Sequence, residues 1–140
     1  MDLNLSLVFP VYGDQTFRGK CPTEVLEQVT FFGRLRERYP DTWGRLGLHP
    51  RNEGLKIKGQ FASVAMHKAE GMTTGASDII IPGGRGGFVC EMKRRDRTQS
   101  AWQDGQIEYL TAAHNAGAFA CVALGCDAAW EAFGEWLAAQ

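Results

Sequence analysis

The sequence predicts a single α/β domain in which a mixed β-sheet is flanked by helices. Segments with a helical repeat of apolar residues alternate along the chain with short apolar runs of strand type. Two of these runs are joined by a glycine-rich turn, which is typical of a β-hairpin. A chain of 140 residues that is 44% hydrophobic and 22% charged buries one core and has no room for a second.

Residues 1–22 are expected to form a strand and a turn-rich lead-in. Leu3, Leu5 and Leu7 alternate with polar residues, which predicts a half-buried strand ending near Pro10. Exposed leucines and unpaired backbone groups on an edge strand are both unfavourable, so this strand needs a partner. Two partners remain open: the sheet of its own subunit, or a second copy of the chain in a homodimer.

A helix is predicted from the N-cap residue Thr23 to about Arg38, where Pro40 closes it. Its apolar side, at helical spacing, is formed by Val25, Val29, Phe31, Phe32 and Leu35. Glu24 lies on the edge of that side, so we expect it to point inward. Glu27 falls on the opposite side and is expected in solvent.

A strand–turn–strand unit is predicted in the middle of the chain. Residues 39–59 are irregular, and a short helix is expected over residues 61–70. Residues 77–82 predict a buried strand, residues 83–87 a glycine-rich turn, and residues 88–93 the returning strand.

The last forty residues predict a helix, a strand and a final helix. The first helix runs from Ser100 or Ala101 to Ala116, with Gln106 in the middle of an apolar stripe of Trp102, Tyr109, Leu110 and Ala113. Residues 118–124 form a buried strand, and Asp127 caps the last helix.

The residues that carry chemistry lie on the predicted hairpin. Residues two apart in a strand share a face, so Glu91 and Lys93 point the same way, and Asp78 begins the partner strand. Two carboxylates that converge beside an ammonium are costly in a buried sheet unless a cation lies between them. Mg²⁺ suits carboxylate and carbonyl oxygens. The lysine can then orient or deprotonate a metal-bound water that attacks a phosphodiester.

The motif by itself leaves other interpretations open. An exposed hairpin with a surface Glu–Lys pair has the same pattern. A non-catalytic DNA-binding or structural module on the same fold, and an enzyme with another carboxylate–metal chemistry, are further alternatives.

The order of motifs resembles the VRR-NUC family, the virus-type replication–repair branch of the PD-(D/E)xK nucleases. The resemblance covers about residues 23–138, with Ser77 where the family usually has proline before the aspartate. It rests on Thr23-Glu-x-x-x-Gln28, the loop His49-Pro-Arg-Asn-Glu-Gly54, Gly75-Ala-Ser-Asp78, Glu91-Met-Lys93 and Gln106 in Gln-x-x-Tyr-Leu.

This resemblance implies a restriction-endonuclease-like core over residues 23–140 and a metal-dependent DNA endonuclease that uses Mg²⁺ or Mn²⁺. The metal ligands it implies are Asp78, Glu91 and the backbone carbonyl of Met92. Glu24 would help to hold the metal or its waters, and Gln106 would steady Lys93. Stand-alone members are of the Holliday-junction-resolvase type, which implies branched DNA as substrate, a role in DNA repair and a homodimer, because symmetric junction cleavage needs two active sites.

Several basic and polar residues near these motifs are candidates for contacts with DNA. The first hundred residues carry all 15 Lys and Arg and 11 of the 16 acids, a net charge of +4, so a polyanion must bind there. Phosphate contacts of this kind give affinity without sequence choice, although a run of arginines is more often a solvated face. The candidates are His49, Arg51, Asn52, Lys56, Lys58, Arg85, Arg94, Arg95 and Arg97.

The remaining features exclude several classes of protein. The four cysteines have no zinc or redox spacing, and Cys90 and Cys121 fall in apolar runs where cysteine is a small core residue. No apolar run reaches the roughly 20 residues that span a bilayer, and the start of the chain lacks a basic region. We therefore expect a cytoplasmic protein with no membrane partner.

Overall fold

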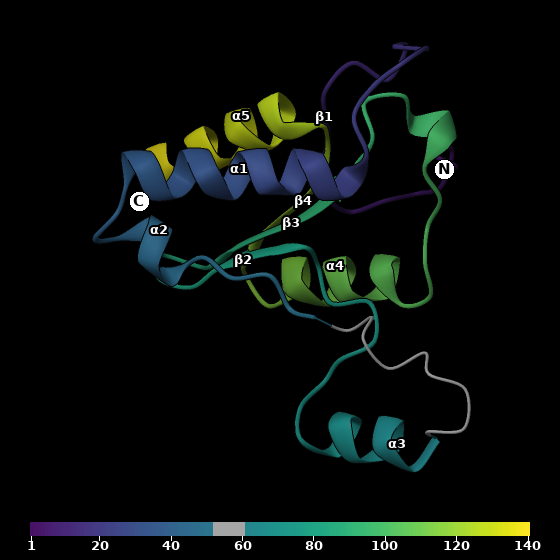
Figure 1. Cartoon of the computed structure of the whole chain (residues 1–140), viewed down its shortest axis with the longest axis vertical. Coiled ribbons are helices and arrows are strands. Elements are labelled where there is room, and N and C mark those ends of the chain that lie inside the picture. The colour runs from purple at the N-terminus through teal and green to yellow at the C-terminus, as the bar shows by residue number, and fades with distance from the viewer. Residues whose placement is uncertain (52–60) are drawn as a thin grey trace.

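The computed structural model describes residues 1–51 and 61–140, and its centre is a four-stranded mixed sheet (Figure 1). The strands are β1 (Val11–Tyr12), β2 (Ile79–Ile81), β3 (Phe88–Lys93) and β4 (Phe119–Leu124), in the order β1-β4-β3-β2. β4 pairs in parallel with β1 and β3, and β2 pairs antiparallel with β3. The predicted mixed α/β fold is confirmed.

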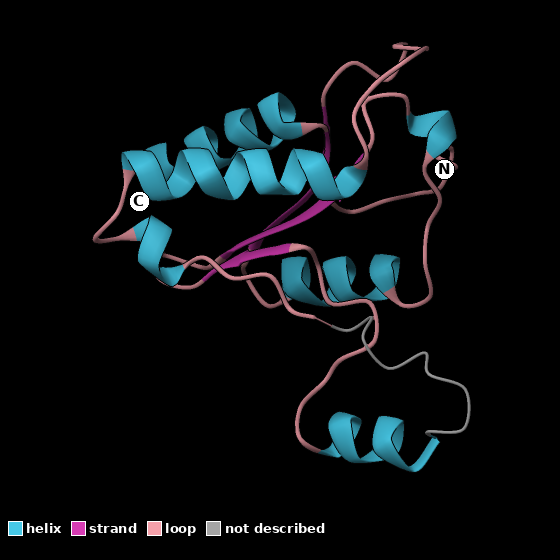
Figure 2. Cartoon of the chain, in the orientation of Figure 1, coloured by secondary structure: helices cyan, strands magenta, loops and turns pink. Residues whose placement is uncertain are grey.

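Helices cover both faces of the sheet (Figure 2). α1 and α5 lie on one face and α4 lies on the other, whereas α3 stands apart from these layers. No helix of the described residues is long and apolar enough to cross a membrane. The bounds are α1 (Glu24–Arg38), α2 (Trp43–Leu46), α3 (Phe61–Ala69), the 3₁₀ turn η1 (Arg97–Gln99), α4 (Gln106–Asn115) and α5 (Cys126–Ala138).

The predicted hairpin is confirmed as β2 and β3. Its register pairs Ile79 with Cys90 and Ile81 with Phe88. The turn contains Gly86 at a φ of 114°, and a Cβ there would lie 2.3 Å from a backbone oxygen of Gly117. Only glycine fits such a turn, because other residues rarely adopt a positive φ. The turn thereby fixes which β3 residue lies opposite the start of β2.

The two faces of β3 differ in character. Cys90 and Met92 are fully buried in a core of aromatic residues from α1 and α5, such as Phe31 and Phe133. Val89, on the alternate face, belongs to a smaller apolar cluster with Leu110 of α4. Glu91 and Lys93 share that face with Val89, and their side chains are buried as well. The sheet thus places two charged residues under α4.

The apolar side predicted for α1 is wrong in part. Phe31, Phe32 and Leu35 are buried, but Val25 and Val29 are 69% and 63% exposed. The stripe that faces the core instead runs through Glu27, Phe31 and Leu35, one helical turn apart. Glu27, predicted in solvent, is 2% exposed.

The hydrogen-bond partners of Glu27 explain why a glutamate is buried at the start of this stripe. Glu27 Oε2 accepts a hydrogen bond of 2.7 Å from the backbone N–H of Cys126, the first residue of α5, and Oε1 accepts one of 2.9 Å from Arg95. A carboxylate at a helix N-terminus is stabilised by the free N–H groups and the helix dipole. Asp127, predicted as the cap of α5, lies in its first turn and is exposed.

The first helix of the C-terminal part begins later than predicted. α4 starts at Gln106, because Gly105 adopts a left-handed conformation with φ 81° just before it. Trp102 therefore lies in the preceding loop, and Gln106 is the first helical residue and not the middle of a stripe. The loop of residues 100–105 runs across the end of β3 that carries Lys93.

Residues 2–8 do not form the predicted strand. The first strand of the described chain is β1, which belongs to the same sheet, so the lead-in of residues 1–22 contributes to the domain. Leu7 packs within its own subunit against the cluster that contains Phe9, whereas Leu5 is 44% exposed. Backbone contacts with the 97–102 loop hold this segment: Arg97 donates to the Met1 carbonyl, and Trp102 Nε1 to that of Asp2.

Candidate active site

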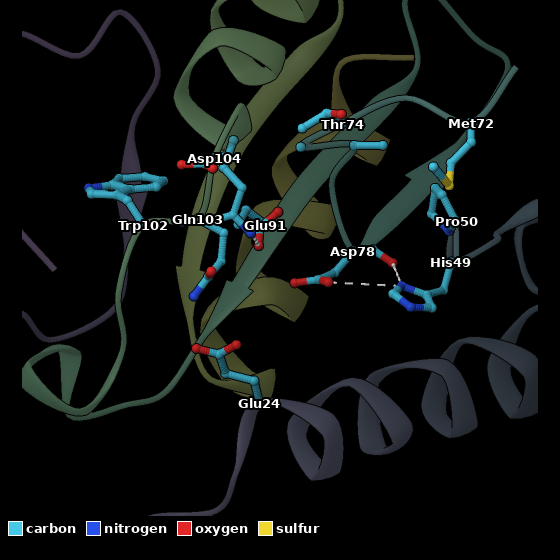
Figure 3. Close-up of a pocket in the computed structure, with 13 residues that line it drawn as sticks. Glu24, His49, Pro50, Met72, Thr74, Asp78, Glu91, Trp102, Gln103 and Asp104 are labelled. Carbon is cyan, nitrogen blue, oxygen red and sulfur yellow. Dashed lines mark hydrogen bonds and ion pairs between the residues drawn. The ribbon is translucent and has the colours of Figure 1, made fainter. Parts of the chain in front are cut away.

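The side chains singled out in the sequence converge on a cavity of about 600 Å³ on the α4 side of the sheet (Figure 3). Its lining comes from the start of α1, the residue before β2, the end of β3 and the first residue of α4. Figure 3 shows the carboxylates of Glu24, Asp78 and Glu91 directed toward the same space. Segments distant in sequence therefore bring three acids together.

Asp78 is held in place by contacts at both ends. Its carboxylate Oδ2 accepts a hydrogen bond of 3.0 Å from the backbone N–H of Met92. Its backbone oxygen lies 2.9 Å from Nδ1 of His49, which is also 3.9 Å from Oδ1. Burial raises the pKa of Asp78 above its usual value, although hydrogen bonds with Glu91 and with the Met92 N–H lower it in part.

Glu91 is the more buried of the two central acids. Its side chain is 2% exposed. Burial first, and then the neighbouring Asp78 carboxylate, raise the pKa of Glu91 to about 9. Two carboxylates in one desolvated site repel each other, so in the metal-free protein one of them retains a proton. A cation bound at such a site would stabilise the ionised form of both carboxylates.

Lys93 is buried beside Glu91 and is held from several directions. Its Nζ donates hydrogen bonds to the Ala101 carbonyl at 2.8 Å and to Gln106 Oε1 at 2.9 Å, and it lies 3.6 Å from Glu91 Oε1. Nζ also lies 5.6 Å from the centroid of the Trp102 ring. The amine therefore has a fixed position beside Glu91, although Lys93 is not among the residues that line the cavity.

Gln106 links the two residues of the Glu-x-Lys motif. Its Nε2 donates to Glu91 Oε1 at 2.6 Å, and its Oε1 accepts from Lys93 and from the backbone N–H of Gln103. A single amide group thus fixes the carboxylate relative to the amine. This is the position expected of a residue that steadies Lys93; its catalytic role stays a prediction.

Glu24 reaches the cavity from the first turn of α1. Its Oε1 accepts a hydrogen bond of 2.7 Å from Ser100, whose own Oγ accepts the backbone N–H of Arg94. Thr23 caps the helix through its side chain, as predicted, which sets the direction in which Glu24 leaves the backbone. The predicted inward orientation of Glu24 agrees with the structure.

The residues present fit a hard divalent cation. Glu91 Oε2 is buried and has no hydrogen-bond partner among the described residues. The N–H of Met92 points at Asp78, and because the N–H and C=O of one strand residue face the same edge, the Met92 carbonyl faces Asp78 too. In the described part of the chain, no group of three or more His, Cys, Asp or Glu side chains is arranged so that it could hold a metal ion by itself. Mg²⁺ needs no such group, since it keeps several waters and takes one or two carboxylates.

Comparison with known proteins places this arrangement in a known fold. No protein-family model and no curated protein matches the chain. A solved structure titled "VRR_NUC domain protein" superposes with a TM-score of 0.67 at 22% identity, over 84% of this chain and 90% of that one. The chain has the VRR_NUC domain fold. The fold predicted from the order of motifs is confirmed.

Several of the predicted DNA contacts are engaged within the VRR_NUC fold. Arg94 donates to the Cys21 carbonyl, Arg95 pairs with Glu27, and Arg97 donates to the carbonyls of Met1 and Gln15. These three side chains hold the lead-in and α1 against the end of β3, and their contacts with DNA stay a prediction.

The other predicted DNA contacts are differently placed. Arg85 is exposed in the β2–β3 turn, at the opposite end of the hairpin from Glu91. His49 and Arg51 border a groove beside the cavity. Asn52, Lys56 and Lys58 lie outside the described residues.

Sequence reasoning missed three residues at or near the site. Trp102 was predicted in a helix. It lies over Lys93 because α4 starts only after Gly105, which leaves Trp102 in the preceding loop. Ser100 links Glu24 to β3, for which the sequence carries no signal. Arg36 borders the groove beside the cavity, where helical spacing from Phe32 and Val29 would have found it.

Proposed function

We propose that the chain is a metal-dependent DNA endonuclease that hydrolyses phosphodiester bonds. The observation that carries the proposal is the convergence of Asp78 and Glu91 at one cavity, with the buried Lys93 amine 3.6 Å from Glu91, on a fold shared with a VRR_NUC domain protein. The carboxylates of the buried Glu91 and the half-buried Asp78 repel each other beside a fixed amine, an arrangement that is typical of functional sites. They are suited to hold a cation that binds a phosphate.

Asp78, Glu91 and the Met92 carbonyl are the proposed metal ligands, with Glu24 holding coordinated waters. Mg²⁺ or Mn²⁺ would supply positive charge to the scissile phosphate and lower the pKa of the attacking water. Lys93, fixed by Ala101 and Gln106, would orient that water in line with the phosphorus. Gln106 would keep Glu91 and Lys93 at a constant separation during the reaction.

The proposed substrate is branched DNA, and a Holliday-junction-type resolvase in DNA repair is the specific form that we propose. The described chain offers one domain and no separate base-reading module, which favours recognition of DNA structure over sequence. Symmetric cleavage of a junction requires two active sites, so the proposed active form is a homodimer. Light scattering at assay concentration measures that state; a monomeric active enzyme contradicts it.

A plasmid-nicking assay tests the activity. Purified protein should convert supercoiled plasmid to the open circle with Mg²⁺ or Mn²⁺, and excess chelator should stop it. A panel of junction, flapped and linear duplex DNAs then ranks the substrates. DNA binding without metal-dependent cleavage would instead identify a non-catalytic module on the same fold.

A further inference from the structure

A second groove, of about 520 Å³, opens beside the active-site cavity and shares Glu24, His49 and Asp78 with it. Its remaining lining comes mostly from α1. The apolar part consists of Val25, Val29, Phe32 and Gly33, and the polar part of Gln28, Arg36 and Arg51. None of the α1 residues other than Glu24 has a role in the proposed chemistry.

The apolar part of this groove is unusually exposed. Val25 and Val29 are 69% and 63% exposed, and they line the groove together with Phe32, which is 7% exposed and also belongs to the core. DNA phosphates are bound by charged and polar groups, so the apolar side chains of this groove do not contribute to binding of the DNA backbone. The apolar parts of a nucleic acid are the faces of its bases.

A base in a duplex is stacked on both faces and is not available to a groove on a protein surface. An unpaired base has free faces, and apolar and aromatic side chains are the usual surfaces that receive them. The edge of the groove carries Gln28, whose amide group both donates and accepts hydrogen bonds, as a base edge requires.

The charges of the groove suit the rest of a nucleotide. The Arg36 guanidinium lies 5.2 Å from the centroid of the Phe32 ring, and Arg51 lines the same groove. Two arginines beside an apolar floor complement a base together with its phosphate. Because Asp78 and Glu24 border both hollows, a nucleotide in the groove is next to a phosphate held in the cavity.

We infer that this groove binds one unpaired nucleotide of the substrate strand, next to the scissile phosphate. The inference rests on the proposed endonuclease activity and narrows its branched substrates to DNA with an unpaired base at the cut site, in place of a fully paired four-way junction. The α1 face is thus a recognition surface that selects for interrupted base pairing without reading the base sequence.

Three labelled DNAs test the inference in chelator, where no cleavage occurs. They are a blunt duplex, the same duplex with one unpaired thymidine, and the same bulge with an abasic residue. Fluorescence anisotropy should show about tenfold tighter binding of the thymidine bulge than of the abasic bulge, the effect of one stacked base. The abasic DNA controls for the flexibility of a bulge.

Gly33→Leu blocks the groove without weakening the fold. A Cβ at Gly33 meets nothing within 4 Å, and replacing a helical glycine favours the helix, so a loss of binding cannot come from unfolding. Gly134→Leu is the matched control, because Gly134 is an exposed glycine of α5 whose Cβ also meets nothing. Gly33→Leu should abolish the preference for the base and leave duplex binding unchanged, and Gly134→Leu should retain the preference.

Equal binding of both bulges by the wild type, or a preference that survives Gly33→Leu, overturns the inference. So does a dimer that Gly33→Leu converts to monomers in sedimentation, since the groove is then a contact between copies of the chain. The nicking assay separates this result from the proposed function. Cleavage without a base preference rejects only the groove, and a base preference without cleavage rejects only the catalysis.

Discussion

The two faces of β3 show how one strand serves stability and chemistry at once. Cys90 and Met92 enter an aromatic core, in which Phe88 and Phe133 have ring centroids 6.0 Å apart. Glu91 and Lys93, on the alternate face, are buried just as deeply but bring charge with them. Burial on the first face stabilises the domain, whereas burial on the second raises the pKa of Glu91 and opposes folding.

The difference teaches that burial alone does not identify a structural residue. A glutamate and a lysine that are each 1% exposed would be expected to neutralise each other in a compact pair. The two do form an ion pair of 3.6 Å, and each is bonded to Gln106, but one glutamate oxygen has no partner among the described residues. This face therefore leaves a carboxylate oxygen of Glu91 available to a ligand.

The largest expected effect is on the charged face. Glu91→Ala and Lys93→Ala should each lower nicking activity by roughly 10²–10⁴-fold, because each removes a group that binds the metal or orients the attacking water. Thermal unfolding should show a fold that is retained. Isothermal titration with Mn²⁺ distinguishes the two: Glu91→Ala should lose most metal binding and Lys93→Ala should keep it. Full activity in either variant rejects the site.

The neighbouring residue on the apolar face should behave in the opposite way. Met92→Ala leaves the backbone groups near Asp78 in place but opens a cavity in a fully buried core, which costs about 2–5 kcal/mol of unfolding free energy. Urea denaturation measures this loss. Activity per folded molecule at low temperature should remain near wild type. A large loss of activity with little loss of stability would show that the two faces are not separable.

The two glutamates of α1 extend the comparison to another element. Glu27→Gln should lower stability by about 1–3 kcal/mol, since it weakens the bonds to Arg95 and to the N-terminus of α5. Arg95 is partly exposed, which keeps the loss below that of a fully buried pair. Glu24→Gln should instead reduce nicking and leave the urea midpoint nearly unchanged. The reverse pattern would show that Glu27, and not Glu24, belongs to the active site.

The charged face also predicts how stability depends on pH. The pKa of Glu91 rises from 4.5 to about 9 on folding, so the folded metal-free protein binds more protons than the unfolded chain. Its contribution to stability is present below pH 4.5 and is lost as the pH rises toward 9. Urea midpoints in chelator should therefore fall over this range, and Glu91→Gln should flatten the dependence. A wild-type midpoint that rises with pH would contradict the direction of the shift.

The sequence predicted the hairpin well because its signals are local. Alternation fixed the shared face of Glu91 and Lys93, and the glycine turn fixed their distance from Asp78. Apart from the start of α4, which Gly105 sets locally, the failures had tertiary causes. The exposed Val29 and the buried Glu27 exchange their expected places because the N-terminus of α5 needs an acceptor, which helical periodicity on α1 does not reveal. The alternation of residues 2–8 likewise gave no strand, because β1 is the segment that pairs with β4.

The smallest expected effect concerns Trp102, which sits at the border of the charged face. Its ring lies 5.6 Å from Lys93 Nζ, and its Nε1 donates to the Asp2 carbonyl, so the lead-in segment holds the ring over the amine. A cation–π contact of this kind contributes about 0.5–2 kcal/mol, or roughly 2- to 30-fold in rate. Trp102→Leu should lower kcat within this range and leave KM nearly unchanged.

A second measurement separates positioning of Lys93 from general support of the fold. Reductive methylation of the metal-free protein, read by mass spectrometry, should spare the buried Lys93 in the wild type and modify it faster in Trp102→Leu. Trp102→Phe keeps an aromatic face over Nζ and should restore both the protection and most of kcat, although it lacks the hydrogen bond to Asp2. If the phenylalanine variant instead matches leucine, the bond to the lead-in and not the ring is what positions the amine.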